Sequence, residues 1–186
     1  MRRMNKPRLL LHCCCAPCLI TAIDRLKNYE IIVFFFNPNI HPYEEYKKRL
    51  ENARNYCNLN SIKFYEGEYD IDLWFKEIKK IKDYDKEPEG GKRCSACFKV
   101  RLKKTADFAL SKNIKFISTT LTLGENKNSK LINRVGKNLA EEKGINFVEI
   151  NLKKQEGFKF SVKKCKECNI YRQNYCGCVF SIRLSK

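Results

Sequence analysis

The chain has 186 residues, 43% of them hydrophobic, and its 38 Lys and Arg against 21 Asp and Glu give a formal net charge of +17. This length predicts one domain, 1–186, that can bury a core without disulfides. No apolar run is long enough to cross a bilayer, and the run at 9–11 is too short for a signal-peptide core, so we expect a cytoplasmic protein with no membrane partner. The charge favours a nucleic-acid partner, although a solvated surface rich in Lys and Glu would also account for it.

The eleven cysteines are the second feature of the composition. In a reducing compartment they are not expected to form a disulfide framework, so clustered cysteines indicate metal or redox chemistry. Cys57 stands alone and is expected to lie in the core. The other ten fall into four groups: Cys13, Cys14, Cys15 and Cys18; Cys94 and Cys97; Cys165 and Cys168; Cys176 and Cys178.

The first predicted element is a short buried strand at 9–11 that ends at His12. The first cysteine group follows at once, and an amphipathic segment at 19–26 predicts a helix after it. In an open α/β sheet such a turn lies at the carboxyl edge of the strands, where these folds bind ligands. Adjacent cysteines pair poorly in a disulfide, but both can ligate a polynuclear metal centre. The turn is therefore the first candidate metal site.

A continuous apolar and aromatic run at 30–36 predicts a strand buried on both faces of a parallel sheet. The loop at 37–42 contains two prolines and His41, and it follows at the same sheet edge as the first cysteines. Helical spacing of apolar residues predicts a crossover helix over 43–57. A lone histidine at a strand end, such as His12, is more often structural than functional, whereas both roles stay open for His41.

Residues 62–69 predict a third strand and 71–81 a helix with an apolar side. Asp70, between them, either caps that helix or ligates a metal at the sheet edge. A charged loop then brings Cys94 and Cys97 to the start of another helix. Their sulfurs are spaced to share one metal centre, and the helix dipole favours their thiolates.

Residues 115–123 predict a fourth strand, 128–143 a helix and 146–150 a fifth strand. This alternation predicts right-handed βαβ units and an α/β fold with a parallel sheet flanked by helices. Neither a P-loop nor a dinucleotide-binding glycine motif is present. The alternation stops after 150, where a tail leads into Tyr-Arg-Gln-Asn-Tyr-Cys-Gly-Cys at 171–178.

One interpretation of the cysteines is a structural zinc site. It would use the two Cys-x-x-Cys pairs, at 94–97 and 165–168, and the protein would be a non-catalytic, zinc-dependent RNA-binding module. This ligand set leaves the first cysteine group and Cys176-Gly177-Cys178 unexplained.

The interpretation that we favour is an iron-sulfur cluster, whose thiolate ligands come from separated segments. Cys14 and Cys15 can converge with Cys94 and Cys97 at one sheet edge. The pair at 176–178 would then serve a second metal or form a redox-active dithiol, because a spacing of one residue closes only a strained disulfide. A dithiol redox protein without metal is the third alternative.

Several of these stretches, taken together, resemble the epoxyqueuosine reductase QueH family, formerly a domain of unknown function. The similarity covers nearly the whole chain, with several rare motifs in the right order. The motifs are 11–18, 36–42 with Glu45-Tyr46 and Arg49, Glu87-Pro88 before 91–94, Cys97 with Arg101-Leu102, 119–121, and 171–178.

The resemblance implies a Rossmann-like fold, similar to the HUP and PP-loop group, with a cysteine-rich C-terminal segment. It implies the last step of queuosine synthesis, the two-electron reduction of epoxyqueuosine to queuosine at the wobble position of tRNA with a GUN anticodon, without cobalamin. It leaves the electron donor unidentified. By position, the [4Fe-4S] ligands correspond to Cys14, Cys15, Cys94 and Cys97, and the redox-active pair to Cys176 and Cys178, with Cys18 next to the place of a second, mononuclear iron.

The chain departs from the family pattern at two places. The family has an ordinary residue where this chain has Cys13, so the triple cysteine leaves a one-residue ambiguity over the ligand pair. Cys165 and Cys168 stand where other residues are expected, which leaves room for an extra metal. A flipped wobble base would need stacking and polar contacts, for which the candidates are His41, Tyr171, Arg172 and Tyr175, with Phe36 as a further stacking candidate. The basic surface would hold the anticodon arm through its phosphates.

Overall fold

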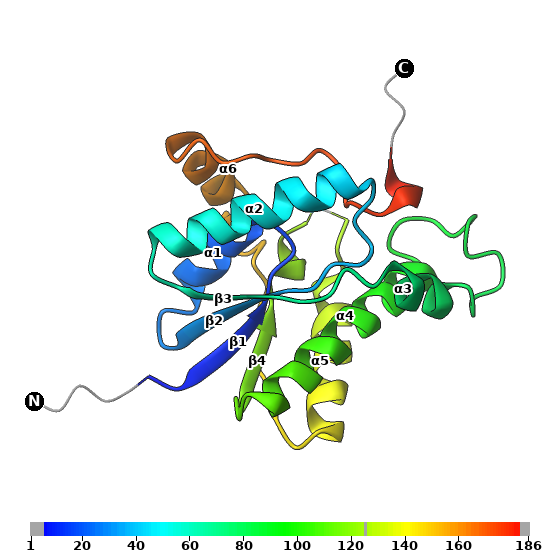
Figure 1. Cartoon of the computed structure of the whole chain (residues 1–186), viewed down its shortest axis with the longest axis horizontal. Helices are drawn as coiled ribbons and strands as arrows, with labels where there is room; N and C mark the ends of the chain where they lie inside the picture. Colours follow the sequence, from blue (N-terminus) through cyan, green and yellow to red (C-terminus); the bar gives the residue numbers. More distant parts are fainter. Residues whose placement is uncertain (1–5, 125, 183–186) are drawn as a thin grey trace, which may run out of the picture.

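The computed structural model describes residues 6–124 and 126–182 (Figure 1). A five-stranded sheet lies at its centre and helices cover both faces. The strands are β1 (Arg8–His12), β2 (Glu30–Phe35), β3 (Lys63–Glu66), β4 (Phe116–Thr119) and β5 (Asn146–Phe147). The helices are α1 (Ala16–Arg25), α2 (Tyr43–Leu59), α3 (Ile71–Ile78), α4 (Lys92–Ser111), α5 (Ser129–Glu142) and α6 (Gly157–Glu167), and the 3-10 turns are η1 (Thr120–Leu123) and η2 (Val179–Ser181).

The sheet is parallel, with strand order β3-β2-β1-β4-β5. The chain builds outward from β1 to β3 and then crosses to the other side of β1 to begin β4. Sheets of this kind bind ligands beyond the carboxyl ends of the strands where the order reverses, here between β1 and β4. The predicted α/β fold with a parallel sheet and flanking helices is thus confirmed.

Successive side chains of β1 enter two different core layers, as the period of a strand requires. Leu9 and Leu11 pack with residues of α1 and α2, including Cys57, which is buried in the core as expected. Leu10 packs on the opposite face with residues of α4 and α5. Figure 1 shows the same division, with α1, α2 and α6 on one side of the sheet and α4 and α5 on the other.

The predicted fourth strand is too long. β4 ends at Thr119, whose side chain accepts a hydrogen bond from the Leu121 amide (3.2 Å) and caps the 3-10 turn η1. Leu121 and Leu123 in this turn are as buried as the strand before them. Hydrophobicity therefore continues past the end of the strand and does not mark it.

The helix α6 was not predicted from the sequence, because lysines outnumber its buried residues. It packs against α1, where the Ser161 hydroxyl donates to the Pro17 carbonyl (2.8 Å). At its first residue a Cβ would lie 1.8 Å from the Leu152 carbonyl oxygen, so only Gly157 permits this approach. These contacts fix the start of α6 beside the β1–α1 turn.

The Asp70 carboxylate accepts a hydrogen bond from the Leu73 amide (2.9 Å), so this residue caps α3. The Cys-x-x-Cys pair opens α4, as predicted. Within the described ranges, no helix combines the length and apolar character needed to span a membrane.

Candidate functional site

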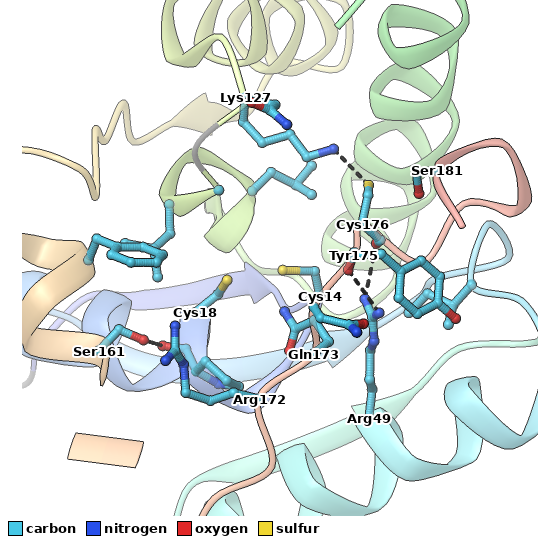
Figure 2. Close-up of a pocket in the computed structure, with 18 of the residues that line it drawn as sticks. Cys14, Cys18, Arg49, Lys127, Ser161, Arg172, Gln173, Tyr175, Cys176 and Ser181 are labelled. Carbon is cyan, nitrogen blue, oxygen red and sulfur yellow. Dashed lines mark hydrogen bonds between the residues drawn. The ribbon is translucent and has the colours of Figure 1, made fainter. Parts of the chain in front are cut away.

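A cavity of about 390 Å³ lies at the carboxyl edge of the sheet (Figure 2). Its walls come from the β1–α1 turn, the loop after η1, the start of α6 and the C-terminal segment at 172–176. Four cationic side chains line it, together with one carboxylate, that of Glu89. Such an excess of positive charge favours thiolates and other anions inside the cavity. The cations are those of Arg49, Arg101, Lys127 and Arg172.

Three thiols converge beside this cavity, and two of them, those of Cys14 and Cys18, line it. The sulfur atoms of Cys14, Cys15 and Cys18 lie within 4.8 Å of one another, and no other described group of three or more Cys, His, Asp or Glu side chains is arranged to hold a metal ion. Figure 2 shows the sulfurs of Cys14 and Cys18 pointing toward each other. The group arises because the turn after β1 places the first two thiols side by side and the first turn of α1 adds the third.

Hydrogen bonds within this group divide its charge unequally. The thiols of Cys15 and Cys18 lower the pKa of Cys14, and the Thr120 hydroxyl also faces its sulfur (3.2 Å). The hydrogen bond with Cys14 raises the pKa of Cys15 to about 12, and the corresponding hydrogen bond raises the pKa of Cys18 well above its usual value. The group therefore favours one thiolate, on Cys14, supported by two neutral thiols.

The structure distinguishes the members of the triple cysteine. Cys13 is fully buried in the core layer of α1 and α2, and its thiol is directed to the Cys15 carbonyl (3.6 Å). Burial raises the pKa of Cys13 well above its usual value. Cys13 thus lies outside the thiol group, which contains the adjacent pair Cys14 and Cys15; of this pair, Cys14 lines the cavity.

The other cysteines near the cavity form a second neighbourhood. Cys97 and Cys178 share an apolar cluster with Trp74, and Cys176 packs against it. Burial raises the pKa of Cys178 to about 12. Burial also raises the pKa of Cys94, and this effect outweighs the hydrogen bond that its sulfur accepts from the Gly90 amide (3.2 Å).

Lys127 is directed at the pair near the C-terminus. Its ammonium lies 2.8 Å from the Cys176 sulfur and 4.0 Å from a Glu89 oxygen, and only 10% of its side chain is exposed (Figure 2). Burial alone would lower the Lys127 pKa, but the negative charge of Cys176 and of Cys94 outweighs it and the pKa is raised. Lys127 therefore supplies a fixed positive charge where Cys176 enters the cavity.

We expect Lys127→Met to slow alkylation of Cys176 by iodoacetamide at neutral pH by roughly tenfold or more, the scale of a hydrogen bond to a charged group. The variant removes the ammonium that contacts the Cys176 sulfur, which is the atom that attacks the reagent. Peptide mass spectrometry measures the rate at Cys176. Lys130→Met, an exposed lysine on α5, is the matched control, and an equal rate in the two variants would contradict the role given to Lys127.

Arg49 holds the C-terminal segment in place. Its guanidinium is 2% exposed, pairs with Glu45 (2.6 Å), and donates to the carbonyls of Tyr175 (3.1 Å) and Cys176 (3.0 Å). A Cβ at Gly177, whose φ is +101°, would lie 2.9 Å from this guanidinium. The pair of cysteines is thus set against α2 by a buried cation and a glycine.

The structure separates the candidate substrate-binding residues. Arg172 and Tyr175 line the cavity, whereas Tyr171 donates to Glu45 (2.8 Å) outside it. His41 also lies outside, with its ring near Trp74 and its amide donating to the Gly177 carbonyl (2.7 Å). Phe36 is fully buried in the α4 and α5 layer, so its predicted stacking role is wrong.

His12 has a structural role. Its ring nitrogens lie 2.9 Å from the Thr119 hydroxyl and 3.2 Å from the Phe36 carbonyl. Burial, together with the charge of Arg101, lowers its pKa to about 3. The ring is therefore neutral, and its two nitrogens link the end of β1 to β4 and to the residue after β2.

Neither predicted four-cysteine ligand set is fully assembled among the described residues, because Cys94 and Cys97 join neither the group of Cys14, Cys15 and Cys18 nor a group with the second Cys-x-x-Cys pair. Cys165 is buried in α6, whereas Cys168 is exposed at its end, and neither belongs to a metal-holding group among the described residues. The Cys165 pKa is raised by burial.

The cavity residues that sequence reasoning missed include Lys127, Phe158 and Gln173. Gln173 lies within the quoted C-terminal motif and donates to the Cys15 sulfur (2.9 Å), yet no spacing rule marks it. Lys127 and Phe158 stand outside the cysteine motifs, in a loop and in the helix that was not predicted.

The fold and the cavity define an α/β protein with a parallel sheet and a thiol-lined site at the carboxyl edge of that sheet. A structural neighbour is described as the U34-tRNA thiolase NcsA from Methanococcus maripaludis with its [4Fe-4S] cluster; the TM-score is 0.54 at 11% identity, over 91% of this chain and 59% of that one. The model of the family described as epoxyqueuosine reductase QueH matches residues 9–184, and the chain belongs to this family of oxidoreductases.

Curated relatives agree with this assignment. A protein of Thermotoga maritima named epoxyqueuosine reductase QueH is 40% identical over 174 residues, which span 94% of this chain and 90% of the relative. One of Staphylococcus epidermidis with the same name is 38% identical over 184 residues, spanning 95% of this chain and 77% of the relative.

Proposed function

We propose that this chain, as a single domain over 1–186, is an epoxyqueuosine reductase that acts on the wobble nucleotide of tRNA with a GUN anticodon and does not use cobalamin. The observation that carries the proposal is the convergence of thiols from residues 14–18 and from Cys176 on one cationic cavity, in a chain of the QueH family. The place of action that we propose is the cytoplasm, where tRNA is the polyanion that the charge of the chain suits.

The proposed metal ligands are Cys14, Cys15, Cys94 and Cys97. The donor chemistry fits a [4Fe-4S] cluster, because thiolates are its usual ligands and Cys14 already packs against the apolar cluster that contains Cys94. When bound, such a cluster supplies electrons one at a time. Cys18, the third member of the thiol group, is the proposed ligand for a further, mononuclear iron.

Reduction of the epoxide to an alkene consumes two electrons and two protons and releases the oxygen as water. Oxidation of Cys176 and Cys178 to a disulfide releases the same two electrons and two protons, so one pair balances one turnover. An external donor must then reduce the disulfide. In this scheme Lys127 orients the Cys176 sulfur and holds a proton beside it, and Arg49 fixes the segment that carries both thiols.

The first experiment is the visible spectrum of anaerobically purified protein, with iron and sulfide analysis and turnover of epoxyqueuosine-containing tRNA. We expect a brown protein with a broad band that bleaches on reduction, about four iron and four sulfide per chain, and formation of queuosine. A colourless protein with stoichiometric zinc and no turnover would contradict the proposal and favour the RNA-binding module. Turnover that survives a chelator but not alkylation would instead favour a dithiol enzyme without metal.

A further inference from the structure

Phe158 is an exposed aromatic side chain at the cavity. Of the twelve phenylalanines in the sequence, all of which the structure describes, it is the only exposed one, at 39%. Phe158 belongs to none of the core clusters among the described residues. Its ring also does not pair with another aromatic ring in that part of the chain. The Arg172 guanidinium lies 5.5 Å from its ring centroid, and both side chains line the cavity. Core packing therefore does not explain this phenylalanine.

The position of the ring is set by rigid neighbours. Phe158 follows Gly157, which is packed onto the Leu152 carbonyl, and precedes by one helical turn Ser161, which is hydrogen-bonded to Pro17. Pro17 is next to Cys18 in the thiol group. The ring is thus held on a helix that is anchored beside the metal-binding turn, which is how a preorganised contact surface is built.

A polar group completes the arrangement. Gln173 also lines the cavity (Figure 2). Its amide nitrogen donates to the Cys15 sulfur (2.9 Å), while its Oε1 is buried without a hydrogen-bond partner among the described residues. A buried acceptor without a donor is costly unless a ligand supplies one. Guanine presents such donors, N1–H and N2–H, on its Watson–Crick edge.

We propose that Phe158 and Arg172 form the stacking site for a flipped guanine-type base, the wobble base of the RNA, and that Gln173 Oε1 accepts a hydrogen bond from its Watson–Crick edge. This inference rests on the proposed function, because the GUN anticodon supplies the base. Aromatic rings and Arg planes are the surfaces on which proteins stack unpaired bases. The excess of positive charge in the cavity suits the phosphates on either side of a flipped nucleotide.

The test is binding of an anticodon stem-loop RNA, with guanine at the wobble position, to the anaerobically purified holoprotein. We expect Phe158→Ala to raise Kd by roughly 5- to 100-fold, the range for loss of one base stack, and Phe158→Trp to keep the wild-type value. Leu110→Ala removes an equally exposed apolar side chain from α4 and is the matched control. A second RNA with 2-aminopurine at the wobble position should show fluorescence quenching with the wild type and Phe158→Trp, but not with Phe158→Ala.

The outcomes separate this inference from the proposed function. If the wild type reduces epoxyqueuosine tRNA and Phe158→Ala raises KM with little change in kcat, both stand. If the wild type turns over and Phe158→Ala binds RNA within about twofold of it, the stacking site is wrong and the function stands. If binding depends on Phe158 but no tRNA is reduced, the function is wrong and the binding site stands.

Discussion

Cys14→Ala is expected to remove nearly all of the bound iron from the anaerobically purified protein. Cys14 is the member of the thiol group that favours the thiolate, which is the form that ligates iron, and both of its neighbours direct their thiols to it. Its amide and sulfur also contact Thr120, so the 3-10 turn η1 helps to fix its position. We expect more than roughly nine-tenths of the iron and the visible band to be lost, as for removal of a cluster ligand.

The matched control for this variant is Cys13→Ala. It removes a sulfur one residue away that is fully buried and lies outside the group, so we expect full iron content and a stability loss of about 1 kcal/mol for a small core truncation. Circular dichroism checks that both variants fold. If Cys13→Ala lost the iron and Cys14→Ala kept it, the adjacent pair assigned to the metal would be the wrong one.

The second large effect is expected at the other end of the chain. Cys178→Ala should keep the iron, the sulfide and the visible band but lose turnover of tRNA. A single remaining thiol at Cys176 cannot form the intramolecular disulfide that releases two electrons and two protons. Because burial raises the pKa of Cys178 to about 12, we expect it to act as the protonated partner of Cys176.

Turnover is measured under anaerobic conditions by digesting the tRNA and quantifying queuosine against epoxyqueuosine. Cys57→Ala is the control, because Cys57 is also buried and burial likewise raises its pKa to about 12, yet it lies in the core away from the cavity. This variant should turn over like the wild type. Turnover by Cys178→Ala at the rate of Cys57→Ala would rule out the redox-pair role.

Much of the fold could be predicted from the sequence because buried parallel strands are short apolar runs followed by turn residues. The run at 30–36 has this form, and the structure forms β2 there. Apolar patterning does not predict the secondary structure where a buried segment is not a strand or where a helix has few buried apolar residues. η1 is as apolar as a strand but curls into a 3-10 turn, and α6 is held by Gly157 and Ser161 rather than by a wide apolar face.

The candidate site was predicted to the level of its cysteine motifs and no further. The strand-to-helix turn correctly placed the first cysteine group at the sheet edge, because chain direction alone decides that position. Which of the adjacent thiols faces the cavity depends on side-chain direction, and this separates Cys13 from Cys14 only in three dimensions. Lys127 and Gln173 contact cysteines that are 49 and 158 residues away, a relation that no local pattern encodes.

The chain has two histidines, and neither faces the cavity as a free acid or base. The low pKa of His12 keeps its ring neutral, with both nitrogens engaged, and His41 packs by Trp74 and Phe75. Among the described residues that line the cavity, the groups that can deliver a proton to a departing oxygen are thiols, the Lys127 ammonium, the Glu89 carboxyl and hydroxyl groups such as that of Tyr175. Imidazole is the usual acid or base of enzymes near neutral pH, and neither histidine is among the described residues that line the cavity. In the proposed scheme the dithiol of Cys176 and Cys178 releases two protons together with its two electrons, so one oxidation exhausts the protons and the electrons of these two sulfur atoms until a donor reduces the disulfide.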